Sequence, residues 1–69
     1  MPKTRVVKAR TAEELDSEIR DLLVLSLMGR GHEMPEIVYV DYYDEAIKEA
    51  SALSQLTARG IKVVWHKQC

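Results

Sequence analysis

Apolar and polar positions along the chain follow patterns that predict three strands and two helices. Apolar residues, mostly β-branched or aromatic, occupy consecutive positions between Glu36 and Tyr42, as is typical of a strand covered on both faces. The segments 3–10 and 61–66 also read as strands, but charged residues interrupt them. We therefore expect the segment 36–42 to be the central strand and the other two to be edge strands.

A first helix is predicted to begin at Thr11 and to end at Gly29. Thr11 and Glu14 have the spacing of a capping box, in which the hydroxyl and the carboxylate each accept from a backbone N–H at the helix start. Gly29 suits the residue that follows a helix. The positions with helical spacing that should face the core are Leu15, Ile19, Leu22, Leu23 and Ser26.

A second helix is predicted to begin after Asp41 or Asp44 and to run without interruption to about Arg59, with Gly60 ending it. Its inner face is expected to consist of Ala46, Ile47, Ala50, Leu53, Ser54 and Thr57.

The order strand, helix, strand, helix, strand predicts one α/β domain over residues 1–69. Short connections and right-handed crossovers favour parallel neighbouring strands. We expect a two-layer βαβαβ sandwich with a three-stranded, mainly parallel sheet and two helices on one face. The other face of the sheet would be open. Because parallel sheets are usually covered on both faces, this architecture indicates association.

Composition restricts the possible functions. The chain has 69 residues, with ten basic and eleven acidic side chains and a net charge of −1. This balance argues against nucleic acid and membrane surfaces as partners. The most apolar run, 22–28, is too short to span a bilayer. A single cysteine, Cys69, suits a reducing compartment. We therefore expect a soluble cytoplasmic protein whose small core favours oligomerisation.

The end of the first helix is apolar nearly all round, which is typical of a helix covered by another element. Two interpretations are open. The connection from Arg30 to Glu36 could fold back over these side chains, or another protein chain could cover them. The outer positions of the second helix are also apolar. The residues assigned to a partner-binding surface are Val24, Leu25, Leu27, Met28, Met34, Ala52 and Leu56.

Polar residues follow each predicted strand, at the sheet edge where open α/β folds usually bind ligands. Thr11 and Asp44 are already explained as helix caps, so we assign no catalytic residue there. His66, Cys69 and His32 are the only imidazole or thiol ligands in the chain, and structural zinc needs four ligands. We therefore expect neither a metal nor a cofactor.

The open sheet face would carry basic residues beside aromatic ones, as in platforms that bind single-stranded nucleic acid. Val6, Lys8 and Arg10 share a face in the predicted register, as do Lys62, Val64 and His66, with tyrosines nearby. Charged residues on edge strands also prevent edge-to-edge pairing of sheets. Since the chain is nearly neutral, we favour this second explanation over nucleic-acid binding.

The sequence does not carry the diagnostic side chains of any natural family that we recognise. The capping box at Thr11 and Glu14, the helix end at Gly60, the short loops and the β-branched strands resemble small computationally designed or engineered α/β proteins. The long connection 29–35 and the apolar outer helix positions depart from an idealised monomer. This resemblance implies interaction rather than catalysis.

We therefore interpret the sequence as that of a non-catalytic protein–protein interaction module. It would bind a protein partner, or itself as a homo-oligomer, through its helix surfaces. The alternative is a small ligand-binding or catalytic α/β domain that uses the carboxyl edge of its sheet.

Overall fold

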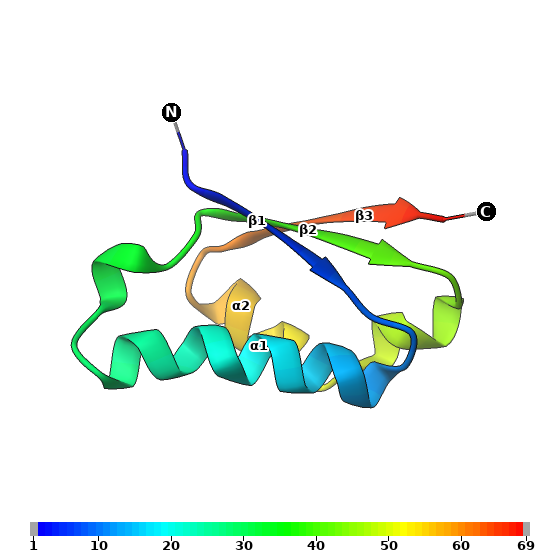
Figure 1. The fold of residues 1–69 in the computed structure, drawn as a ribbon, viewed down its shortest axis with the longest axis horizontal. Helices are drawn as coiled ribbons and strands as arrows, with labels where there is room; N and C mark the ends of the chain where they lie inside the picture. The colour runs from blue at the N-terminus through cyan, green and yellow to red at the C-terminus, as the bar shows by residue number, and fades with distance from the viewer. Residues whose placement is uncertain (1, 69) are drawn as a thin grey trace.

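The sheet has three parallel strands, and the computed structural model describes residues 2–68 of the chain. Strands β1 (Thr4–Lys8), β2 (Ile37–Tyr42) and β3 (Lys62–Lys67) are ordered β1-β2-β3, so β2 is central (Figure 1). This confirms the predicted α/β fold class and the position of its central strand.

The register of the sheet places two sets of side chains on opposite faces. Val40 of β2 is fully buried and pairs with Val7 on one side and Trp65 on the other. Alternation along the strands puts the next row on the opposite, open face, where Tyr39 pairs with Val6 and Val64. The central strand therefore contributes one of its faces to the core, while no helical segment of residues 2–68 covers its other face.

All helical segments lie on one side of the sheet (Figure 1). The first crossover contains helix α1 (Ala12–Leu27) and the 3₁₀ helix η1 (Gly31–Glu33). The second crossover contains the 3₁₀ helix η2 (Glu45–Glu49) and the short helix α2 (Leu53–Ala58). The two-layer arrangement agrees with the expectation from the sequence.

The capping box at the start of α1 forms with one difference from the predicted pattern. The hydroxyl oxygen of Thr11 accepts from the backbone N–H of Glu14 at 3.1 Å. The carboxylate of Glu14 accepts from the backbone N–H of Arg10, at 2.6 Å, rather than from that of Thr11. The box therefore also holds Arg10, which lies two residues after the end of β1.

Both α-helices end at a glycine with a positive φ. Gly29 has φ 74° and Gly60 has φ 76°, a conformation that favours glycine. After α1, the N–H of Arg30 donates to the carbonyl of Leu25 at 2.7 Å, which turns the chain back toward the sheet. The helix ends predicted at these two glycines are confirmed.

The prediction of one continuous second helix is wrong. Ala50 has an extended backbone, with ψ 123°, and separates η2 from α2. Buried side chains explain the break: at 100° per residue, Ile47 and Ala50 would lie on the opposite side of a straight helix from Ala52 and Leu56. The change of direction lets both pairs reach the same core.

One hydrophobic core lies between the sheet and the helices. The 3₁₀ and α-helical segments cover it together, and no charged or polar residue is buried among the residues that the structure describes. The core consists of Val7, Ala9, Leu15, Ile19, Leu22, Val38, Val40, Tyr42, Ile47, Ala50, Ala52, Leu56 and Ile61.

Candidate functional site

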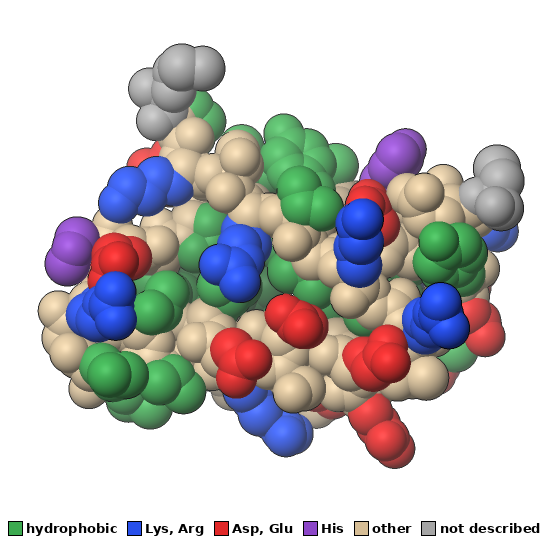
Figure 2. Space-filling model, in the orientation of Figure 1, with side chains coloured by type: hydrophobic (Ala, Val, Ile, Leu, Met, Phe, Trp, Pro, Cys, Tyr) green, Lys and Arg blue, Asp and Glu red, His purple; other side chains and the backbone are tan. Residues whose placement is uncertain are grey.

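Three apolar side chains are exposed together over the last turns of α1 and at its C-cap. Leu27 is 83% exposed, Met28 63% and Val24 43%. Their spacing of three and four residues puts them on one face of the helix, pointing away from the core. Figure 2 shows hydrophobic side chains gathered over this end of α1. We call Val24, Leu27 and Met28 the α1 apolar surface.

Two residues assigned to the partner-binding surface pack against the core instead. Leu25 and Met34 are half-buried there, so their assignment to an outward-facing surface is wrong. The α1 apolar surface stays exposed beside them. The interpretation that the connection from Arg30 to Glu36 covers the end of the helix is therefore wrong for Leu27 and Met28.

The assignment of Ala52 and Leu56 to the outer side of the second helix is wrong. Leu56 is fully buried and Ala52 is 8% exposed, and both belong to the core. A single helical phase cannot run from Ile47 through Ala50, because the helix is interrupted there. Leu56 is therefore not available to a partner in the folded chain.

A groove runs beside the α1 apolar surface, between α1 and the start of α2. It has a volume of about 330 Å³, and Arg20, Leu23, Ser51, Ala52 and Gln55 line it. Leu23 lies one turn before Leu27 on α1, so the groove lies close to the apolar surface, although Val24, Leu27 and Met28 do not line it. A partner that covers the exposed end of α1 could also contact this groove.

Charge is distributed unevenly along α1. Its first ten residues include the acidic side chains of Glu13, Glu14, Asp16, Glu18 and Asp21, together with Arg20. Residues 22–28 carry no charge. Figure 2 shows acidic side chains over the N-terminal half of the helix and hydrophobic ones over its C-terminal end. The apolar surface is thus bounded on one side by acidic residues.

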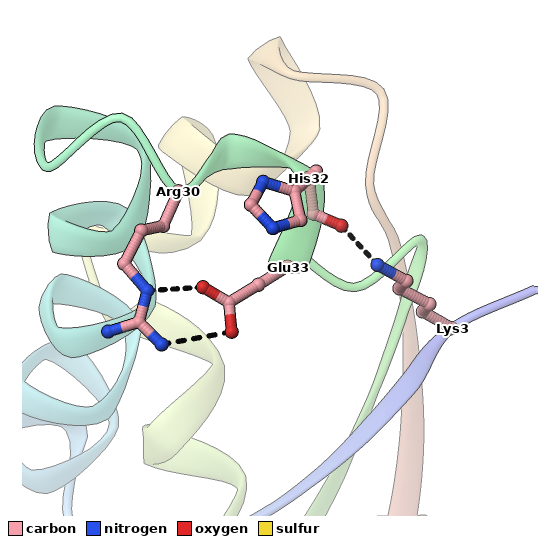
Figure 3. Close-up of polar contacts among 4 residues, drawn as sticks. All are labelled: Lys3, Arg30, His32 and Glu33. Carbon is pink, nitrogen blue, oxygen red and sulfur yellow. Dashed lines mark hydrogen bonds and ion pairs between the residues drawn. The ribbon is translucent and has the colours of Figure 1, made fainter.

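The turn after α1 bounds the apolar surface on its other side with an ion pair. The guanidinium of Arg30 binds the carboxylate of Glu33 through two contacts, one of 3.0 Å between Nη2 and Oε1 and a shorter one from Nε (Figure 3). The ammonium of Lys3 donates to the carbonyl of His32 in the same turn (Figure 3). The hydrogen bond from Arg30 lowers the pKa of Glu33, and Glu33 raises that of Arg30.

The open face of the sheet carries the second group of exposed apolar side chains. Val6 is 58% exposed, and Tyr39 and Val64 beside it are half-buried. A shallow hollow of about 380 Å³ lies over these residues. Lys8, Lys62 and His66 lie on this face too, as predicted, whereas Arg10 lies beyond the end of β1.

The carboxyl edge of the sheet brings one acid and one histidine together. Nδ1 of His66 lies 3.3 Å from Oδ1 of Asp41 on the neighbouring strand, and the amide nitrogen of Gln68 lies 3.1 Å from the same Nδ1. Thr11 and Asp44 serve as helix caps, as predicted. Asp41 and His66 also line the shallow hollow of about 380 Å³ on the open sheet face. Two smaller hollows, of about 250 and 100 Å³, lie nearby at this edge.

A cluster of aromatic and basic side chains beside β3 was not predicted from the sequence. The rings of Tyr42 and Trp65 meet edge to face at 5.6 Å, and Nζ of Lys48 lies 5.1 Å from the Tyr42 ring centroid. Glu45 lies 3.0 Å from Lys48 Nζ and raises the pKa of that ammonium. Lys48 therefore covers aromatic surface that the short second crossover leaves partly exposed.

Neither a cluster of metal-ligating side chains nor a membrane-spanning helix occurs within residues 2–68. Within residues 2–68, no three His, Cys, Asp or Glu side chains lie together as a possible metal site. None of the helices in this same part of the chain has the length and apolar character to cross a membrane. Cys69, considered above as a ligand, lies outside the described residues.

Comparisons of the chain with protein-family models, with curated protein sequences and with solved structures found no match. A function for this chain must therefore be argued from its own surfaces.

Proposed function

We propose that this chain is a non-catalytic interaction module that binds a protein through the α1 apolar surface. One observation carries the proposal: Val24, Leu27 and Met28 are exposed side by side on one face of a well-capped helix. Burying a fully exposed side chain of this kind is worth roughly 1.5–3 kcal/mol, a sizeable fraction of the stability of so small a domain.

The chemistry of this surface suits a protein partner. Leucine and methionine fill gaps between packed side chains, and methionine adapts its shape to different partners. The groove along Leu23 and Ala52 extends the contact area beyond the exposed end of α1. The acidic residues and Arg30 supply the charged rim that interfaces usually place around an apolar centre.

Ligand binding or catalysis at the carboxyl edge is a second candidate, supported by the 3.3 Å contact between Asp41 and His66. We rank this function lower because the two side chains lie on neighbouring strands in direct register, where such cross-strand pairs commonly stabilise the sheet itself. The hollow that both side chains line is shallow and lies over the open sheet face.

Photo-cross-linking from single positions tests the proposed function. A benzophenone amino acid replaces Leu27 in one variant, Val6 in a second and Glu13 in a third. The three variants are irradiated as purified protein and again in cell extract, and mass spectrometry identifies the adducts. We expect adducts from position 27 and none from position 13. Adducts from position 6 without any from position 27 would move the interaction site to the open sheet face and overturn the proposal.

A further inference from the structure

The α1 apolar surface is bordered by opposite charges at its two ends. Asp21 lies one turn before Val24 on α1, and Arg30 lies just after Met28 in the turn that ends the helix. A surface with a negative charge at one end and a positive charge at the other complements itself when a second copy is rotated by 180°.

We propose that the partner of the α1 apolar surface is a second copy of this chain, paired through antiparallel α1 helices. The inference rests on the proposed function, because it uses the same exposed side chains. A two-fold axis perpendicular to α1 between Val24 and Leu27 places each of these residues against the other in the second copy. The contact is isologous, so every interaction occurs twice.

The same axis brings the two charges together. Asp21 and Arg30 lie on opposite sides of an axis between Val24 and Leu27, at about the same number of residues from it. Asp21 of one copy therefore lies level with Arg30 of the other along the paired helices.

Arg30 can make this contact without losing its partner within the chain. Its side chain is 52% exposed, and its contacts with Glu33 use Nε and Nη2. A guanidinium carries five N–H donors, so the donors on Nη1 are available to a second carboxylate. Asp21 is exposed and forms no ion pair among residues 2–68. The pairing thus gives the carboxylate of Asp21 an ionic partner, which it does not have within residues 2–68 of a single chain.

Charge reversal tests the pairing by sedimentation equilibrium over about 10 μM to 1 mM, a range suited to a small interface. We expect wild-type chain to dimerise. Asp21→Arg and Arg30→Asp should each weaken the dimer by about tenfold, because two attractive pairs become repulsive. An equimolar mixture of the two variants should recover a heterodimer, since both contacts are attractive again. A fluorophore on one variant identifies the mixed species.

Control variants separate the inference from the proposed function. Lys62→Glu reverses a charge on the open sheet face and should leave dimerisation unchanged. Arg30→Asp removes the ion pair with Glu33, so circular dichroism is used to check that this variant still folds. Asp21→Arg tests the same contact without altering the turn. A monomeric wild type at 1 mM overturns the inference, and so does a dimer that Asp21→Arg leaves intact. Cross-links from position 27 to a different protein would in that case leave the proposed function standing.

Discussion

The carboxylate of Asp16 on α1 accepts a hydrogen bond of 2.8 Å from the backbone N–H of Ala52, at the start of α2. No side chain of α2 caps its own first turn. Asp16 therefore serves as the cap of a helix distant in sequence, and its other oxygen lies 3.5 Å from the hydroxyl of Ser51. This contact fixes the place where the second crossover changes direction and joins it to the first helix.

Removing this cap should destabilise the fold. Asp16→Ala leaves a partly buried N–H without an acceptor, and lost helix caps typically cost about 1 kcal/mol. For a domain of this size, that loss lowers the melting temperature by about 4–8 °C. Thermal unfolding followed by circular dichroism measures the difference from wild type.

Two further variants test the assignment of the cap. Asp16→Asn keeps an oxygen that can accept from Ala52 and should recover most of the stability. Glu18→Ala removes an acid from the same helix without removing a hydrogen bond in the structure, and should melt close to wild type. Equal melting temperatures for Asp16→Ala and Glu18→Ala would show that the contact with Ala52 contributes nothing.

The interruption of the second crossover could not be predicted from local preferences. The segment from Glu45 to Ala58 is rich in good helix formers, so propensity alone favours one helix. The burial of Ile47 and Leu56 on opposite sides of a straight helix shows why tertiary packing overrides that preference. The out-of-phase apolar positions were the one signal in the sequence, and Asp16, the distant cap, carries no local mark of its role.

The sheet and the first helix were predictable because their patterns are strong and local. The consecutive apolar residues around Val40 identified the central strand, and Thr11 with Gly29 identified the limits of α1. The candidate surface was predictable only in part. Periodicity places Leu25 and Leu27 together outside the core stripe, but it cannot show that Leu25 packs against the edge of the core whereas Leu27 stays exposed.

Burying a charge in the central strand should abolish folding. Val40 is fully buried between Val7 and Trp65, so Val40→Asp places a carboxylate without a partner in the core. The cost is several kcal/mol, comparable to the entire stability of a domain of this length. Val6→Asp on the open face, at a side chain that is 58% exposed, is the matched control and should unfold cooperatively. A cooperative urea transition in Val40→Asp would contradict the assignment of β2 as the core strand.

The ion pair between Arg30 and Glu33 should contribute stability that depends on pH. Arg30 holds the pKa of Glu33 below its ordinary value of 4.5 in the folded chain. A carboxylate with a depressed folded pKa stabilises the protein fully above its unfolded pKa. That contribution is lost as the pH falls from about 4.5 through the lowered value. We therefore expect wild type to exceed Glu33→Gln in stability at pH 7, and the two to converge in acid.

Urea unfolding of both proteins at a series of pH values between neutral and strongly acidic measures this convergence. Because both side chains are well exposed, the difference at pH 7 should be small. Glu18→Gln removes a carboxylate that forms no ion pair in the described structure, and it controls for the loss of one negative charge. A difference between wild type and Glu33→Gln that persists unchanged in strong acid would exclude this ion pair as its source.

Two leucines on α1 should separate folding from association. Leu25 is half-buried against the core, so Leu25→Glu should lower the free energy of unfolding by roughly 2 kcal/mol or more. Leu27 is 83% exposed, so Leu27→Glu should change that free energy by less than about 0.5 kcal/mol while abolishing association. Urea unfolding and sedimentation velocity on the same samples measure both effects. If Leu27→Glu unfolds as readily as Leu25→Glu, Leu27 belongs to the core and the interaction surface lies elsewhere.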